Sequence, residues 1–288
     1  MTVKTVDDEL DRVLGKMSRK YRGIQEKVEK DGLPRDQVLG ALQAIFDGKF
    51  AAADAGTIVV PQRPKLIRGL FTPPEQQIVH VRDWKAKRPD WADVPEAWFT
   101  KLGPAPAWPS QLHGCVVLEI ALPDLPERKD AEGNTLPAIS GYVRTVRDLW
   151  GIISSQHPSH WKYEQFFLDA EHLFLLDGAT YEPGLRWRVL DLGANWDKKN
   201  GIAPATVRNP VTSPNVDGFA ALAHHPRFVQ KMDGVKVPYT WIPGFQVTVS
   251  GHDPRPDVPL ANFNRDARRV NLNTHWDGHR RSHYAVPV

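Results

Sequence analysis

Apolar residues recur at helical spacing in the first part of the chain. Between residues 5 and 30 they follow each other at steps of three and four, with charged residues between them, which predicts an amphipathic helix. Asp31-Gly32 ends this helix, and a second, shorter helix is predicted from Pro34 to Phe46. Residues 1–50 are therefore expected to form a helical hairpin, which is a candidate docking module.

Residues 51–110 lose this periodicity and contain many prolines, which predicts a proline-interrupted helical connection. One helix is expected to begin here, with Thr72 as N-cap, Pro73 in the first turn and Glu75 three residues on, the arrangement of a capping box. Pro89 should end it, because proline cannot continue a helix beyond its first turn.

Three tryptophans follow each other at seven-residue spacing in this connection: Trp84, Trp91 and Trp98. Seven residues are close to two helical turns, but Pro89 and Pro95 lie between them and rule out one continuous helix. We interpret the three rings as core anchors around a broken helix, in preference to a ligand-stacking platform.

From residue 111 onwards the pattern changes to short β-prone runs separated by turn residues. These runs are residues 115–122, 161–168, 185–192, 244–249, 258–263, 270–275 and 282–286. Helical spacing interrupts them at residues 142–155 and 219–232, and residues 123–141 are expected to form an exposed loop. Because strands and helices do not alternate regularly, the predicted fold class is α+β. We expect an N-terminal helical segment followed by a mostly antiparallel sheet domain, residues 111–288, with two or three packed helices.

Composition fits a folded protein, since 41% of the 288 residues are apolar and 25% are charged. The N-terminus lacks the apolar core of a signal peptide and no run of about 18 apolar residues occurs, so no membrane partner is expected. The single cysteine, Cys115, lies in an apolar run, which predicts a buried thiol and fits the cytoplasm. The net charge of +3, from 37 basic and 34 acidic residues, does not by itself indicate a polyanionic partner.

One apolar strand is predicted to end in Asp191-Leu192-Gly193-Ala194, which is similar to the first motif of S-adenosylmethionine-dependent methyltransferases. That motif needs further glycines and a helix that opens directly after the turn. Here no helix is predicted before Phe219, and Pro204 and Pro210 intervene. We interpret the segment as a strand that leads into a turn, and we predict no cofactor.

Histidines are spaced by four residues near the C-terminus, at His275, His279 and His283, with Asp277 among them. On a helix this spacing would bring the three rings to one face and make a zinc site. On a strand four residues span about 13 Å, too far for successive histidines to share an ion. The flanking sequence is strand-like and residues 276–278 form a turn signal, so a hairpin is predicted. It leaves His275 and His279 facing each other, a pair too small for a predicted metal site.

The common signatures of nucleophile, phosphate and zinc sites are missing from the sequence, so whether the chain is an enzyme stays open. One hypothesis is a hydrolase or nuclease with an unfamiliar site. The candidate catalytic residues are Asp191, Asp197, His275 and Asp277.

Arginines and aromatic residues crowd the last part of the chain, which is the chemistry that tracks phosphates and stacks bases. The leading hypothesis is a non-catalytic binding or interaction protein, whose partner is a protein or a nucleic acid. The residues expected to present this surface are Trp196, Trp276, Arg268, Arg269, Arg280 and Arg281.

Four segments also resemble a set of uncharacterised proteins from uncultivated bacteria with reduced genomes. They are residues 184–197 (GLRWRVLDLGANWD), 207–210 (VRNP), 238–244 (PYTWIPG) and 283–288 (HYAVPV). The resemblance implies a bacterial cytoplasmic protein, and it brings no activity, cofactor or catalytic residue with it.

Overall fold

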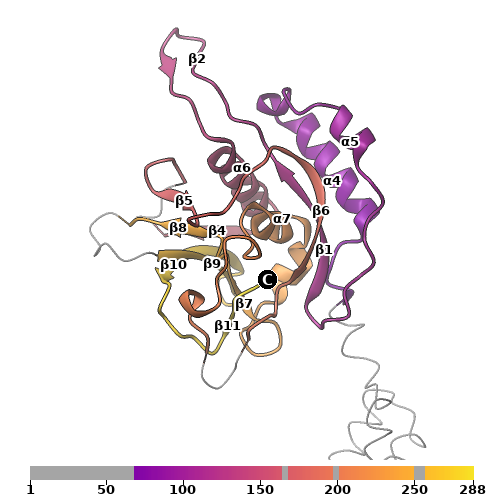
Figure 1. Ribbon diagram of the computed structural model, residues 1–288, viewed down its shortest axis with the longest axis vertical. Coiled ribbons are helices and arrows are strands. Elements are labelled where there is room, and N and C mark those ends of the chain that lie inside the picture. The colour runs from indigo at the N-terminus through magenta and orange to yellow at the C-terminus, as the bar shows by residue number, and fades with distance from the viewer. Residues whose placement is uncertain (1–67, 164–167, 197–200, 250–256) are drawn as a thin grey trace, which may run out of the picture. The chain divides into compact units, whose positions relative to one another are not determined.

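The computed structural model describes residues 68–163, 168–196, 201–249 and 257–288 (Figure 1). The chain divides into two units between residues 60 and 61, and all of the described residues belong to the second unit. This unit combines helices with antiparallel and mixed sheets, so the predicted α+β class is confirmed. The hairpin predicted for residues 1–50 lies outside the described residues.

The described part of the second unit contains five helices and two 3-10 turns. They are α4 (Pro74–Lys87), α5 (Ala97–Lys101), α6 (Gly141–Ser155), α7 (Val216–His224) and α8 (Pro226–Lys231), with 3-10 turns η1 (Pro89–Trp91) and η2 (Pro204–Thr206). The strands are β1 (Gly114–Ala121), β2 (Arg128–Lys129), β3 (Thr135–Leu136), β4 (Ser159–Lys162), β5 (Leu173–Leu175), β6 (Gly184–Asp191), β7 (Tyr239–Trp241), β8 (Phe245–Val247), β9 (Asp257–Asn264), β10 (Arg269–Trp276) and β11 (Tyr284–Ala285).

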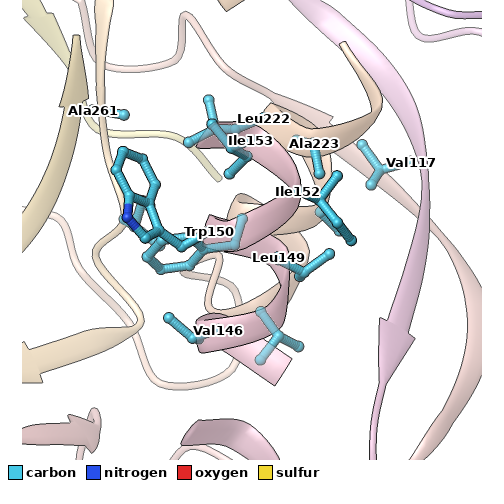
Figure 2. Packing of buried hydrophobic residues seen from close by; sticks show 14 of the residues in the cluster. Val117, Val146, Leu149, Trp150, Ile152, Ile153, Leu222, Ala223 and Ala261 are labelled. Carbon is cyan, nitrogen blue, oxygen red and sulfur yellow. The ribbon is translucent and has the colours of Figure 1, made fainter. Parts of the chain in front are cut away.

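These elements are arranged in layers. Helices α4 and α5 lie beside the two-stranded ribbon of β1 and β6, and α6 and α7 lie between this ribbon and the large sheet (Figure 1). Figure 2 shows apolar side chains of α6 and α7 filling the space between Val117 on β1 and Ala261 on β9. Helix α6 supplies Leu149, Trp150 and Ile153 to this core, as its helical spacing predicts.

The large sheet has the strand order β11-β7-β9-β10-β4, and β8 pairs with both β5 and β9. Most of its pairs are antiparallel, while β10–β4 and β11–β7 are parallel. Along β10 the side chains alternate between the two faces. Val270 and Leu272 point into the core, and Arg269 and Asn271 point to the opposite face, which we call the outer face.

A second, smaller apolar cluster covers one end of the outer face. It contains Trp241, Val258, Leu260, Tyr284 and Val286, with Ile202 and Val207 packed against it. The rest of the outer face, on β4, β9 and β10, carries half-buried polar and aromatic side chains.

Strand β1 is buried along its whole length and pairs with β6 on one edge only. Side chains complete the other edge. The Gln77 side chain donates to Val116 O at 2.8 Å and accepts from Leu118 N at 2.8 Å, as a neighbouring strand would. His224 Nε2 donates to Leu118 O at 2.9 Å, and Thr145 Oγ1 accepts from Leu122 N at 2.8 Å, just beyond the end of the strand. Side-chain groups therefore take the place of a third strand at Val116, Leu118 and Leu122.

Two local predictions are wrong. The Thr72 side chain does not cap α4: its hydroxyl donates to the carbonyl of His224, so a tertiary contact replaces the capping box. The helix predicted for residues 219–232 breaks into α7 and α8 at His225, because Pro226 has no N–H to continue the hydrogen-bond ladder.

The predicted C-terminal hairpin is also wrong, because its two strands, β10 and β11, are present but do not pair with each other. Strand β10 pairs with β9 and β4, whereas β11 crosses to the far edge and pairs with β7. The predicted loop of residues 123–141 contains the small hairpin of β2 and β3. Trp91 is fully buried, and Trp84 and Trp98 pack partly buried against the core, as anchors should.

Candidate functional site

A row of side chains crosses the open part of the outer face. Trp161 on β4 lies opposite Asn271 on β10, which lies opposite Asn262 on β9. All three are half-buried. The register continues the row to Tyr239 on β7 and Tyr284 on β11. The row on this face of the sheet therefore has two amide side chains in the middle and aromatic rings at both ends.

Arg269 stands beside this row, with its guanidinium carbon 5.8 Å from the centre of the Trp161 ring. This distance is within the range of a cation–π contact, which holds the arginine over the indole. Arg269 Nε and Asn271 Oδ1 have no hydrogen-bond partner within the described part of the chain. Both atoms are buried, so they lie unpaired within the packing beside the indole and are not exposed to a ligand.

The amides form the start of a hydrogen-bonded chain. Asn271 donates from Nδ2 to Asn262 Oδ1 at 2.7 Å, and Asn262 in turn lies 3.5 Å from the Tyr284 hydroxyl. The guanidinium carbon of Arg281 lies 6.0 Å from the Tyr284 ring. This arginine donates to His275 Nε2 at 2.6 Å and so joins the amides to the histidines.

His275 and His279 lie together, as the sequence predicts, with their Nδ1 atoms 3.4 Å apart. Because His275 Nε2 accepts from Arg281, the neutral ring carries its proton on Nδ1 and donates it to His279. Burial, followed by the charge of Arg281, lowers the pKa of His275 to about 4. The pair is therefore neutral at pH 7 and acts as a hydrogen-bonding unit.

His283 lies apart from this pair, since its Nδ1 is 3.1 Å from the carbonyl of Gly234. Across the residues that the structure describes, no three histidine, cysteine or acidic side chains come together as a metal site. The arrangement therefore offers two imidazole ligands at this end of β10, and one of them, His275, already accepts a hydrogen bond from the guanidinium group of Arg281.

The predicted binding residues are divided among several places. Arg269 and Arg281 both contribute to the outer face, and Arg268 is exposed in the turn that precedes β10. Arg280 is exposed in the connection to β11. Trp276, which is 44% exposed, follows the core-facing alternation of β10 and therefore points away from the outer face.

Trp196 lies between β6 and the C-terminal segment. Its Nε1 donates to Ser282 O at 3.1 Å, and its ring meets His113 edge-on with 5.6 Å between centroids. These contacts hold the indole against the protein's own backbone.

The candidate catalytic acids also bond to their own chain. Asp277 pairs with Arg208 at 3.0 Å, and both side chains are largely buried. Asp191 Oδ1 accepts from Gly193 N at 3.0 Å in a local turn. His275 bonds to His279 and Arg281 instead of to either carboxylate, and Asp197 lies outside the described residues.

The methyltransferase-like turn holds one of the protein's own side chains. A Cβ built on Gly193 would lie 2.1 Å from Nδ1 of His113, so glycine is needed there for the close approach of this imidazole. Strands β1 and β6 are antiparallel, unlike the parallel strands of a cofactor-binding βαβ unit. The residues around Gly193 therefore do not fit the cofactor.

A second polar cluster lies beneath β6. Glu119 contacts Arg186 Nε at 3.1 Å and Arg188 Nε at 2.5 Å, and Asp217 begins α7 nearby with hydrogen bonds from the amides of Asn215 and Gly218. Burial, followed by the charge of Glu119, raises the pKa of Asp217 to about 6. The two acids lie inside the packing of α7 on β1, which makes this cluster structural in character.

Sequence reasoning missed Trp161, Asn262 and Asn271. Alternation of polar and apolar residues along residues 269–275 was the available signal for Asn271. Trp161 could not be placed beside it from sequence, because β4 and β10 are far apart along the chain.

No protein-family model, curated protein or solved structure matches this chain. Of the helices described, none is both long and apolar enough to cross a lipid bilayer.

Proposed function

We propose that this protein is a non-catalytic binding protein whose outer sheet face binds single-stranded nucleic acid. The observation that carries the proposal is the pairing of Trp161 with Arg269, next to the half-buried residues Asn262 and Asn271. As part of the same proposal we place the protein in the bacterial cytoplasm, which its single buried cysteine and the sequence resemblance support.

The chemistry of these side chains suits a single strand better than a duplex. An exposed base can stack on the half-buried indole of Trp161, whereas paired bases are already stacked on each other. Arg269 can neutralise a phosphate, and the amide row supplies hydrogen bonds to a base edge. Arg268, exposed at the turn before β10, adds a positive charge next to Arg269 in the sequence.

The enzyme hypothesis has less support. Asp277 is held by the buried Arg208, and Asp191 bonds its own turn, so neither carboxylate is left facing His275 as a general base or metal ligand.

Binding of the full chain to labelled single-stranded RNA and DNA, measured by fluorescence anisotropy at several salt concentrations, tests the proposal. Trp161→Ala should weaken binding by roughly tenfold or more, because stacking contributes about 1–3 kcal/mol per base. Trp161→Phe should retain most of the affinity. Arg269→Ala should reduce the slope of log affinity against log salt by about one.

Trp276→Ala is the matched control, since this indole is exposed but lies on the other side of β10. It should leave the affinity unchanged, and a duplex of the same sequence should bind more weakly than the single strand. Equal losses for the Trp161 and Trp276 variants, or no binding at low salt by the folded chain, would contradict the proposal.

A further inference from the structure

Strand β6 has an unpaired outer edge. The N–H and C=O groups of Leu118 bond to side chains of α4 and α7, on the side away from β6. Leu118 and Trp187 are therefore a non-hydrogen-bonded antiparallel pair, and the N–H and C=O groups of Trp187 point away from β1. The same alternation directs the N–H and C=O groups of Leu185 and Val189 outward. In the part of the chain that the structure describes, these outward groups have no hydrogen-bond partner. Such an edge can accept another strand.

The unpaired stretch is short and has a defined end on each side. At one end Pro183 has no N–H to offer. At the other end the amide of Asp191 donates to Val288 O at 2.9 Å. The free positions therefore run from residue 185 to residue 189, with Trp187 at their centre.

We propose that a second copy of this chain occupies the edge, with β6 antiparallel to β6 about a two-fold axis at Trp187. In this register Leu185 lies opposite Val189 of the partner subunit and the two Trp187 side chains are neighbours. Aromatic and aliphatic cross-strand pairs of this kind stabilise antiparallel sheets. Val189 is 48% exposed in the single chain, and the pairing would bury it.

Charge also favours a second copy over a charged peptide. The opposite side of β6 carries Arg186 and Arg188, which both contact Glu119, and Arg186 also lies 3.4 Å from Glu182. Two guanidinium groups are thus balanced by two carboxylates. A face without excess charge attracts neither an acidic nor a basic peptide, and it can approach an identical face without net repulsion.

The end of β6 adds further apolar surface. Val288, which is bonded to Asp191, is 43% exposed, and Leu112, close to the start of β1, is 39% exposed. Val288 is bonded two residues beyond Val189, and Leu112 lies two residues before Gly114, which pairs with Asp191.

Light scattering of the full chain over about a hundredfold range of concentration tests the pairing. The wild-type mass should approach twice the chain mass of 32.5 kDa at the upper end. Val189→Lys should remain monomeric, because it replaces the apolar cross-strand contact with Leu185 of the partner subunit by a charge. Val211→Lys is the matched control, since Val211 is 86% exposed elsewhere, and it should dimerise as the wild type does.

A second variant tests the register independently of Val189. Trp187→Cys should form a disulfide-linked dimer under mild oxidation, because a hydrogen-bonded antiparallel pair sets the two Cα atoms about 5.5 Å apart. Cys115 is buried and should not react, and Val211→Cys should remain unlinked. A wild-type chain that is monomeric throughout, a dimeric Val189→Lys chain, or a dimeric Trp187→Cys chain that does not cross-link would each overturn the proposal.

Discussion

Gln77 takes the place of a strand residue at the edge of β1. Its amide oxygen accepts from Leu118, and its amide nitrogen donates to the carbonyls of Val116 and Thr72 at 2.8 and 2.9 Å. The side chain is fully buried, so no water can replace these partners. One residue therefore connects α4 to the centre of β1.

Gln77→Glu should destabilise the protein by about 2–4 kcal/mol. A carboxylate would face two carbonyl oxygens in a buried site, with both donors lost. Urea unfolding at pH 7.5 measures the change. Gln76→Glu, one residue earlier and exposed, is the control and should stay close to the wild type. A Gln77 variant as stable as this control would show that the bonds to β1 contribute little.

Single residues were the hardest scale to predict from sequence. Arg269 and Arg281 could be named because arginine clusters near aromatic residues in the printed sequence, but their neighbours depend on strand pairing. The polar spacing of Thr72 fits a helix cap, and the alternative partner is the carbonyl of His224, more than 150 residues away along the chain. Local patterns contain no information about such a contact.

At the scale of elements, α7 shows how burial opposes a charge. Asp217 sits in its first turn, where a negative charge is normally favourable, yet it is buried close to Glu119. Its pKa is therefore raised to about 6. A carboxyl whose pKa is higher in the folded state than in the unfolded chain contributes stability at low pH, and this contribution is lost as the pH rises through the folded value.

Asp217→Asn should therefore gain stability relative to the wild type above pH 6, by roughly 1–3 kcal/mol. The amide keeps an acceptor for the backbone N–H groups of Asn215 and Gly218 and has no charge to bury. Urea unfolding at pH 4 and pH 7.5 should show the gain only at the higher pH. An equal difference at both values would mean that the carboxyl is not proton-linked to folding.

Elements themselves were largely predictable. The strong alternating or continuous apolar runs gave β1, β6, β9 and β10, and helical spacing gave α6. The short strands β5 and β7 have too few residues for a pattern, and the break between α7 and α8 was visible only as Pro226. Pairing was not predictable, because β11 crosses the sheet to reach β7 and its sequence fits a hairpin with β10 equally well.

For the whole molecule, buried histidines make the free energy of unfolding depend on pH. Burial lowers the pKa of His224 well below its usual value, that of His225 to about 3, and that of His275 to about 4. The unfolded chain binds protons to these rings from about pH 6.5 downward, whereas the folded chain does not. Their contribution to stability is present above pH 6.5 and is lost as the pH falls toward 3.

The free energy of unfolding should therefore fall between pH 6.5 and pH 5, before most carboxylates titrate, at up to about 1.4 kcal/mol per pH unit for each ring. Asp217 acts in the opposite direction, so the Asp217→Asn chain should show the steeper fall. Urea titrations at half-unit intervals of pH measure the slope. A flat profile across this window would show that the imidazoles are solvated or already charged in the folded state.

The edge of β1 that side chains cover also affects the tendency of the protein to aggregate. The segment Cys115-Val116-Val117-Leu118 is apolar and β-prone, and the Gln77 and His224 side chains cover outward peptide groups of Val116 and Leu118. If α4 detached while the rest of the fold stayed intact, it would expose an apolar strand edge that can pair with another chain. Conditions that loosen this one helix should therefore start fibril-like assembly well before the molecule unfolds as a whole.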